Sequence, residues 1–393
     1  MEIISFEKAQ ETVLKSSFRM TTEKVSFTDS LYRVLAEDIA SDMDMPPFNK
    51  ATVDGFACRR CDLGRVLDLA GTIAAGSHSR EEISENICFR IMTGASVPAG
   101  ADMVFMVEDS HINPDGKVSY TGAFSKDNIS KRGEDIKKGD TVLKQGKLIS
   151  PQDIAVMASV GHTSVIVSAM PKVTVISSGD ELVEPSEKPG ISKIRNSNAY
   201  QLMAQLKRAG AMGEYLGIAG DNESVTYDIL THALSVSDIV LITGGVSMGD
   251  FDFVPSVMER AGVKILFSRV NVQPGKPTTF GVHPKAIVFG LPGNPVSSFL
   301  QFELLVRPVI CEMMGCQFVP VTFSLPMKDS FTRRTTDRMA WIPVVISKDG
   351  RVSPVEYHGS AHISALASAD GIIMLPEGKK TIEKGEVVSV RQI

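Results

Sequence analysis

The hydrophobic pattern of the chain changes character at about residue 172. From there to about residue 315, short continuous apolar runs such as KVTVI and DIVLIT alternate with segments whose apolar residues recur every three or four positions. Runs of the first kind are typical of strands buried on both faces of a parallel sheet, and segments of the second kind are typical of amphipathic helices. We therefore predict a doubly wound α/β domain over residues 171–320.

The unit of strand, loop and helix is clearest in the middle of this domain. Residues 239–242 form an apolar run, and Gly244 and Gly245 then allow positive φ and close approach of a ligand. Apolar residues at helical spacing follow over residues 254–261, and Asp252 is the predicted N-cap of that helix.

The loop of this unit also contains Ser247, Asp250 and Asp252. Backbone N–H groups of such a loop can bind phosphate together with the helix N-terminus, and the two carboxylates can hold a Mg²⁺ ion that binds phosphate. The alternative is a tight turn with solvated carboxylates, because the spacing matches neither the dinucleotide-binding nor the P-loop fingerprint.

Polar residues follow the other predicted strands as well. In an open parallel sheet, the loops at the carboxyl ends of the strands lie along one edge, where ligands bind. We expect the following residues to converge on that edge: Glu181, Asp221, Asp250, Asp252, Lys276 and Asn294. Asn294 is in addition a predicted N-cap, with Pro295 at the first helical position.

The chain on either side predicts smaller parts. Residues 45–140 consist of short, turn-rich segments, as in a small β or α+β domain. Residues 321–393 hold short strands between turns and predict an all-β domain. Helical spacing is present over residues 6–18 and again over 151–159, which predicts a helical N-terminal module. If the second helix packs on the first, the turn-rich segment is an insertion into this module.

Composition and charge narrow the function. The chain has 393 residues and a net charge of −5, so it can form several domains and lacks the basic character of nucleic-acid binders. Neither a membrane-spanning apolar run nor a signal-peptide pattern is present, so we expect a cytoplasmic protein. Five cysteines, an odd number, fit reduced thiols. Cys58 and Cys61 form a C-x-x-C pair, which leaves a structural metal and an incidental pair as alternatives.

Eight motifs follow one another between residues 46 and 371: PPFNKATVDGFA, IMTGASVPAGADMVFMVED, RGEDIKKGD, SSGDELVEP, TGGVSMGDFD, QPGKP, LPGNPVSS and HGSAHISALASADG. In this order they resemble the motifs of the molybdopterin molybdenumtransferases, a family to which the C-terminal domain of gephyrin is related. The resemblance covers nearly the whole chain, and the set of motifs is far more specific than any one of them.

The resemblance implies an enzyme that inserts molybdate, its substrate, into adenylylated molybdopterin and releases AMP, with Mg²⁺ as cofactor. It implies an elongated subunit of four parts, formed by residues 1–44 with 141–170, 45–140, 171–320 and 321–393. It also implies a homodimer whose site lies between the α/β domain of one chain and the inserted domain of the other.

The family's site residues are carried to this chain by the matching motifs. The predicted catalytic residues are Asp54, Thr93, Glu108, Glu181, Asp221, Asp252 and Lys276, and Glu181, Asp221 and Asp252 are also the predicted Mg²⁺ ligands. The predicted substrate-binding residues are Gly244, Gly245, Ser247, Asp250, Pro274, Gly275, Asn294, Pro295, Ser297 and Ser360. Ser360 is expected to face the oxyanion, and Lys276 to bind molybdate or the developing phosphate charge.

The chain departs from the family pattern at two positions. Gln273 stands where family members often have lysine, and Pro343 stands where an arginine is common. Both family residues would hold anion charge, and the candidates to replace them are Arg333, Arg334 and Arg338.

Two other functions stay open. One is the adenylylation of molybdopterin by ATP, whose enzymes share a related α/β domain; the additional domains here argue against it. The other is a non-enzymatic scaffold with the same dimer fold, and retention of Asp54, Asp221, Asp252 and Lys276 argues against a purely structural role.

Overall fold

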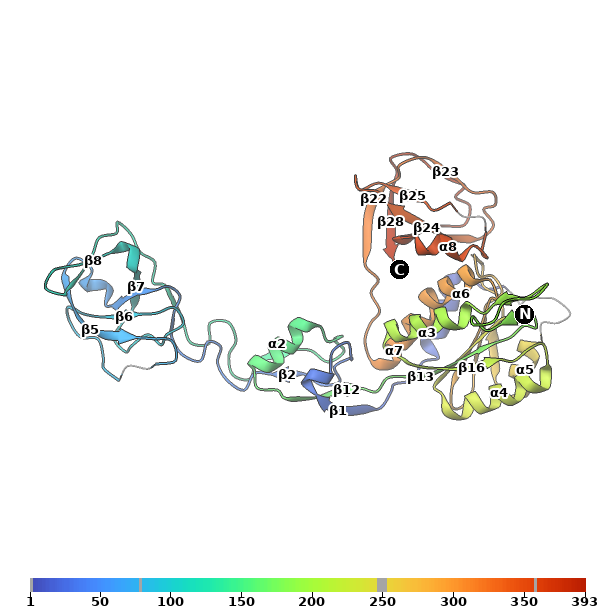
Figure 1. Ribbon diagram of the computed structural model, residues 1–393, viewed down its shortest axis with the longest axis horizontal. Coiled ribbons are helices and arrows are strands. Elements are labelled where there is room, and N and C mark those ends of the chain that lie inside the picture. The colour runs from blue at the N-terminus through green and yellow to red at the C-terminus, as the bar shows by residue number, and fades with distance from the viewer. Residues whose placement is uncertain (1–2, 78–79, 246–252, 357–358) are drawn as a thin grey trace.

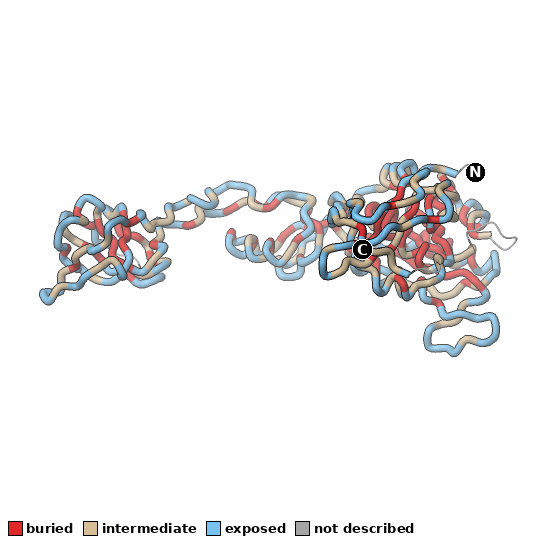
Figure 2. Tube along the Cα trace, turned by 90° about the horizontal axis from the view of Figure 1, so that it is seen from above, coloured by how far each residue is buried: buried red, intermediate tan, exposed pale blue. Residues whose placement is uncertain are grey.

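The computed structural model describes residues 3–77, 80–245, 253–356 and 359–393. Figure 1 shows an elongated chain with a small β-rich body at one end, a narrow middle part and a larger mass at the other end. Seen from above in Figure 2, buried residues gather inside the two end bodies, whereas the connection between the small body and the middle part is largely exposed or intermediate. Within the described residues, no helix is both long and apolar enough to cross a membrane.

A six-stranded sheet is the centre of the larger mass. Its order is β16, β13, β17, β21, β20, β18, formed by Met212–Ile218, Lys172–Ser177, Ile239–Thr243, Ile287–Leu291, Thr279–Val282 and Lys264–Phe267. The first four strands are parallel, but β20 is antiparallel to both of its neighbours. The open parallel sheet predicted from the sequence is therefore wrong at this strand. The short turn between β20 and β21 permits only an antiparallel pair, and this makes the sheet mixed.

Helices cover both faces of this sheet, and the continuous apolar strands follow from that. Ile239 and Leu241 of β17 point into one core, and Val240 and Ile242 point into the other. The helices are α3 (Asn198–Ala209), α4 (Glu223–Val236), α5 (Val254–Arg260), α6 (Pro295–Gln301), the π-helical η4 (Phe302–Val306) and α7 (Arg307–Met314). Gly210 closes α3 in the left-handed conformation.

The first helix, α1 (Phe6–Lys15), packs on this α/β domain rather than on the second helix of the N-terminal module. Its buried residues Phe6, Ala9 and Val13 belong to the core that also contains β13 and α7. Helix α2 (Pro151–Ser159) belongs to a separate core in the middle part. The expected packing of these two helices on each other is therefore wrong.

Strand pairs hold the middle part together instead. Strand β1 (Thr22–Ser26) pairs with β12 (Ser164–Ser168), and β2 (Ile39–Ala40) pairs with β11 (Thr141–Leu143). The chain thus leaves this part after β2 and returns at β11. The segment between them forms the small outer body, which lies at the far end from the six-stranded α/β sheet (Figure 1).

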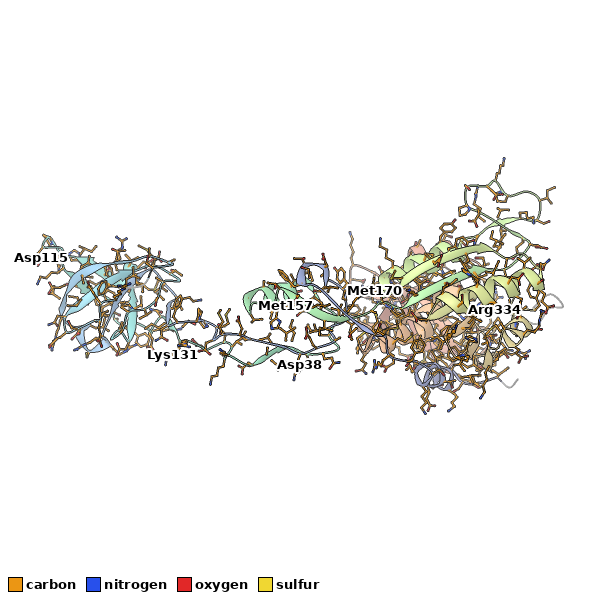
Figure 3. All side chains as sticks on the ribbon, turned by 90° about the horizontal axis from the view of Figure 1, so that it is seen from below. Asp38, Asp115, Lys131, Met157, Met170 and Arg334 are labelled. Atoms are coloured by element: carbon orange, nitrogen blue, oxygen red, sulfur yellow. The ribbon has the colours of Figure 1, made fainter. Side chains whose placement is uncertain are left out.

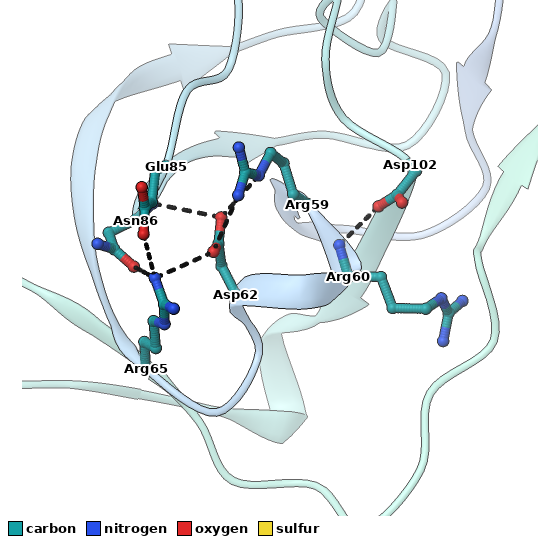
Figure 4. Close-up of polar contacts among 7 residues, drawn as sticks. All are labelled: Arg59, Arg60, Asp62, Arg65, Glu85, Asn86 and Asp102. Carbon is teal, nitrogen blue, oxygen red and sulfur yellow. Dashed lines mark hydrogen bonds and ion pairs between the residues drawn. The ribbon is translucent and has the colours of Figure 1, made fainter.

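The small outer body is a six-stranded sheet in the order β7, β4, β6, β5, β9, β8, formed by Met103–Met106, Gly55–Cys58, Ile87–Ile91, Val66–Ile73, Val118–Tyr120 and Ser110–Ile112. The short pair β3 (Lys50–Ala51) and β10 (Ile129–Ser130) lies at its base. In Figure 4, Asp62 lies between two arginines, with its carboxylate 3.0 Å from Arg59 Nε and 3.7 Å from Arg65 Nη1. This buried carboxylate is therefore paired and fixes the turn that precedes β5.

Two segments of the chain connect the outer body to the middle part, and an ion pair links these segments. Asp44 accepts a hydrogen bond from Arg132 Nε at 2.7 Å and another from the Lys138 backbone N–H at 3.0 Å. The Lys138 N–H and the Arg132 guanidinium hold the pKa of Asp44 below its usual range. Figure 3 marks the connection with Lys131 beside the outer body and Asp38 in the middle part.

The C-terminal domain shares a strand with the α/β domain. Its sheet has the order β19, β24, β26, β28, β22, formed by Val272–Gln273, Met339–Ile346, Gly371–Leu375, Val387–Gln392 and Thr322–Pro326, and β25 (Val352–Pro354) pairs with β24. Strand β19 comes from the α/β segment and pairs in parallel with β24. Two further elements complete the domain: the strand pair β23 (Phe331–Thr332) and β27 (Thr381–Ile382), and a short helix, α8 (Ile363–Ala367). The domain therefore contains a helix, whereas the sequence predicted an all-β domain.

Candidate functional site

Two adjoining pockets lie at the edge of the α/β sheet where the parallel strands end. The first is a cavity of about 670 Å³ lined mainly by loops of the α/β domain, together with Ala361 and Ile363 of the C-terminal domain, and the second is a cavity of about 560 Å³ between the two domains. Pro277, Pro292 and Asn294 line both pockets. We call them the α/β pocket and the seam pocket.

Two predicted carboxylates line the α/β pocket. Glu181 follows β13 and Asp221 follows β16, so neighbouring strands bring both to one edge of the sheet. The two loops are tied together, because the Asp180 N–H donates to Asp221 Oδ2 at 3.2 Å and the Asp221 N–H donates to Asp180 Oδ1 at 2.9 Å. Asp252, the third predicted Mg²⁺ ligand, lies outside the described residues, and among the described residues no group of three acids, histidines or cysteines is placed to hold a metal.

The donor chemistry of this pocket still fits Mg²⁺. This ion is commonly bound by one or two protein carboxylates together with substrate phosphates, rather than by a complete protein cage. Glu181 and Asp221 supply that number of carboxylates at one pocket wall.

Gly244 and Gly245 line this pocket at the end of β17, as predicted. Both have positive φ, 93° and 62°. A Cβ atom on Gly244 would lie 2.2 Å from the backbone oxygen of Ser178, so only glycine fits without moving the backbone of β13 and its loop. Ser247 and Asp250 lie outside the described residues, and Phe253 holds the N-cap position of α5 that was predicted for Asp252.

Two further residues of the α/β pocket were not among the predicted site residues. Ser178 Oγ and Asn198 Oδ1 are buried and have no hydrogen-bond partner among the described residues. The Asn198 amide is fixed, because Nδ2 donates to Thr243 Oγ1 and to the Gly293 backbone oxygen, both at 2.8 Å. Unpartnered buried polar atoms are costly unless a ligand or water satisfies them, so both residues are candidates to contact substrate. Their sequence signal is a polar residue directly at a strand end or helix start, which is common elsewhere.

The seam pocket has the opposite charge. Lys276, Arg333 and Arg338 line it, and none of its lining residues in the described part of the chain is acidic. The predicted substrate-binding residues Pro274, Gly275, Asn294, Ser297 and Ser360 also line it. Pro295 lines the α/β pocket and begins α6 as predicted, but the side chain of Asn294 makes no capping hydrogen bond.

The two positions that depart from the family pattern differ in placement. Gln273 lines the seam pocket next to Lys276. Pro343 is a residue of β24 opposite Ile372 of β26 and is not among the residues that line the pocket.

The remaining predicted residues lie in the outer body. Asp54 Oδ1 accepts hydrogen bonds from the Thr93 backbone N–H at 2.6 Å and from Thr93 Oγ1 at 2.7 Å. These bonds hold the pKa of Asp54 below its usual range. Glu108 belongs to the turn η3 (Val107–Asp109), whose first N–H donates to the Asp54 backbone oxygen at 3.1 Å. Asp54, Thr93 and Glu108 thus lie together, but the fold keeps them away from both pockets of the same chain (Figure 1).

The C-x-x-C pair gives no support to a metal site in the described residues. Cys58 is buried in β4 and Cys61 is exposed. Burial raises the pKa of the Cys58 thiol to about 12, which disfavours the thiolate that a metal would require.

Comparisons with known proteins cover the whole chain. The family described as MoeA N-terminal region (domain I and II) matches residues 4–161, the probable molybdopterin binding domain matches residues 174–312, and the MoeA C-terminal region (domain IV) matches residues 325–393. The molybdopterin molybdenumtransferase of Bacillus subtilis (strain 168) is 36% identical over 389 residues, which cover 94% of this chain and 89% of that protein.

Two other relatives agree. The molybdopterin molybdenumtransferase of Staphylococcus epidermidis (strain ATCC 35984) is 35% identical over 398 residues, covering 98% of this chain and 95% of that protein. The crystal structure of the molybdopterin biosynthesis moeA protein from Pyrococcus horikoshii OT3 has a TM-score of 0.87 at 30% identity, covering 100% of both chains. The chain therefore belongs to the molybdopterin molybdenumtransferase family.

Proposed function

We propose that the protein inserts molybdate into adenylylated molybdopterin and releases AMP, giving molybdenum cofactor. The observation that carries this proposal is the pair of adjoining pockets with opposite charge at one sheet edge. The reaction brings a pyrophosphate-containing pterin together with a tetrahedral oxyanion. Adjoining acidic and cationic pockets suit these two substrates.

The α/β pocket is the proposed site of the pterin and its pyrophosphate. Gly244 and Gly245 let phosphate approach the backbone, and Glu181 and Asp221 would hold Mg²⁺, with Asp252 as a third ligand. When bound, Mg²⁺ supplies positive charge that withdraws electron density from the scissile P–O bond.

The seam pocket is the proposed site of molybdate. Lys276 provides a fixed positive charge, and the hydroxyl groups of Ser297 and Ser360 provide donors for oxyanion oxygens. Asn294 lines both pockets, which supports a position for the oxyanion next to the pterin, where the dithiolene must receive the metal.

We also propose that the active form is a cytoplasmic homodimer. Asp54, Thr93 and Glu108 lie on the outer body, remote from both pockets of their own chain (Figure 1). A twofold arrangement of two elongated chains would bring the outer body of each to the pockets of the other and create two identical composite sites.

The composite site can be tested with two inactive variants, Asp54→Asn and Asp221→Asn. If the site is shared, a mixed dimer collects both substitutions in one site and leaves the other intact. Refolding the two variants together should restore up to roughly a quarter of wild-type activity, because about half of the dimers are mixed. No recovery, with mixed dimers shown to be present, would exclude a shared site.

The reaction itself is tested by following nucleotides. Purified protein incubated with adenylylated molybdopterin, molybdate and Mg²⁺ should release AMP in proportion to the molybdenum incorporated. Consumption of ATP with molybdopterin would instead favour the adenylylation reaction. Neither activity in a folded dimer would favour a scaffold.

A further inference from the structure

The seam pocket contains three cationic side chains, and the structure gives them different tasks. Arg333 is 8% exposed and donates all three kinds of guanidinium N–H group to backbone oxygens. Its Nε, Nη1 and Nη2 atoms lie 2.7 Å from the oxygens of Lys379, Arg338 and Pro376, respectively. Because burial removes water from its guanidinium, the pKa of Arg333 is lowered. The N–H groups of Arg333 therefore hold the backbone of the domain in place, and the charge of Arg333 adds positive potential to the pocket.

Arg338 is placed differently. Its side chain is 25% exposed. Among the described residues, its guanidinium approaches one carboxylate, with Nε 3.4 Å from Asp337 Oδ2. That approach is no hydrogen bond, since Nε is buried and has no hydrogen-bond partner among the described residues. The Asp337 side chain is 66% exposed, so water screens the pair. Arg338 therefore retains donors and charge for a ligand in the seam pocket.

We propose that Arg338 is an oxyanion-binding residue, acting together with Lys276, and that Arg333 is a positioning residue for it. This inference rests on the proposed function. Arg333 Nη1 donates to the backbone oxygen of Arg338 itself, so it fixes the backbone from which the ligand-binding side chain extends. A planar guanidinium can bind two oxygens of a tetrahedral anion through two parallel N–H groups, a fixed geometry that the ammonium group of a lysine lacks. Arg334 is exposed and lines neither pocket, which excludes it from this task.

The seam pocket contains a fluorescent side chain that can report ligand binding. Trp341 is the single tryptophan of the chain, and it lines the seam pocket. Titration of the full-length protein with molybdate should therefore change tryptophan fluorescence, and equilibrium dialysis with elemental analysis gives the bound amount directly. Sulfate and tungstate carry the same charge as molybdate and serve as comparison ligands. Sulfate is smaller than molybdate, and tungstate is similar to it in size.

We expect Arg338→Gln to raise the molybdate concentration for half-saturation roughly tenfold or more, which is about 1.4 kcal/mol. The matched control Arg334→Gln removes the same charge from the same domain and should bind molybdate as the wild type does. Arg338→Lys, which keeps the charge but loses the planar fork, should give an intermediate value. Thermal unfolding should show that these variants fold, and in turnover assays Arg338→Gln should change the molybdate dependence more than the rate at saturating molybdate.

Wild-type affinity in Arg338→Gln would overturn the assignment of Arg338, even if AMP release proved the proposed function. Equal weakening in Arg334→Gln would overturn it too, because the effect would then be a general one of charge. Absence of molybdate binding to the wild type would likewise overturn it. AMP release with wild-type protein decides the proposed function separately, so the two failures are distinguishable.

Discussion

The two pockets differ in how the chain builds them. The α/β pocket is formed mainly by loops that follow strands of one sheet, so most of its polar residues lie at equivalent places in a repeated pattern, and the C-terminal domain adds only Ala361 and Ile363 among the described residues. The seam pocket is formed where β19 leaves the α/β domain to pair with β24 of another domain. The first kind of site follows from local pattern and one topological rule. The second depends on the docking of two domains, and no local pattern specifies that docking.

The charges of the two pockets differ for the same reaction. The α/β pocket carries two carboxylates and one arginine, Arg195, whereas the seam pocket carries one lysine and two arginines and no acid among the described residues. In the proposed reaction, the two pockets would hold Mg²⁺ and the oxyanion at separate, neighbouring positions. If this comparison is correct, substitutions in the two pockets should have different kinetic effects.

The largest expected effect is in the α/β pocket. Asp221→Asn removes a carboxylate but keeps the side-chain shape, and we expect turnover to fall roughly a hundredfold or more, the scale of losing an electrostatic partner of the transition state. Excess molybdate should not rescue it. The control Asp228→Asn changes an exposed acid on α4 and should leave AMP release unchanged. Near-normal turnover of Asp221→Asn at saturating Mg²⁺ would remove this carboxylate from the site.

The next effect compares a glycine from each pocket. Gly244→Ala places Cβ 2.2 Å from a backbone oxygen, whereas Gly275→Ala places Cβ 2.2 Å from the side-chain amide of Gln301. Both residues have positive φ, but a side chain can move more easily than a backbone. We expect Gly244→Ala to lower the free energy of unfolding by roughly 2 kcal/mol, and Gly275→Ala to lower it by less. Denaturant unfolding measures both, and the reverse order would mean that the Gln301 side chain is the more rigid obstacle.

A smaller effect is expected from the lysine of the seam pocket. Lys276→Ala should raise the molybdate concentration for half-maximal insertion roughly tenfold and leave the rate at saturating molybdate nearly unchanged. The matched control is Lys285→Ala, an exposed lysine in the turn at the other end of β20. An unchanged molybdate dependence in Lys276→Ala would move this lysine to the phosphate side of the reaction or out of the site.

The same contrast between local pattern and domain packing decides which parts of the fold could be predicted from the sequence. Apolar runs and glycine positions predicted the alternation of strands and helices in the α/β domain, and the predicted apolar run at residues 239–242 lies within β17. The antiparallel β20 was missed because its residues, TFGV, carry no signal of direction. The packing of α1 was missed because an apolar helix face does not say which core will bury it.

The site residues show the same difference between what local pattern predicts and what depends on tertiary contacts. Strand-end position brought Glu181 and Asp221 to one pocket as predicted. The separate tasks of Arg333 and Arg338 could not be predicted, because both are arginines in one short polar segment. Only the fold shows that the Arg333 guanidinium donates to three backbone oxygens and that the Arg338 guanidinium has no such partners among the described residues.

The smallest effect on stability is expected from a hydroxyl in the α/β pocket, and a neighbouring serine provides the control. Ser177 and Ser178 are both buried at the end of β13. Ser177 Oγ accepts a hydrogen bond from Asn196 Nδ2 at 2.9 Å, but Ser178 Oγ has no partner among the described residues. Ser177→Ala should therefore lower the free energy of unfolding by about 1 kcal/mol, whereas Ser178→Ala should leave it nearly unchanged.

Substrate binding should show the opposite order. If Ser178 Oγ is satisfied by the pterin substrate, Ser178→Ala should raise the KM for adenylylated molybdopterin roughly threefold, the scale of one net hydrogen bond. Its molybdate dependence should match the wild type, because Ser178 lines only the α/β pocket. Loss of stability without any change in KM would show that the hydroxyl is satisfied inside the protein, and the case for a substrate contact at this position would fail.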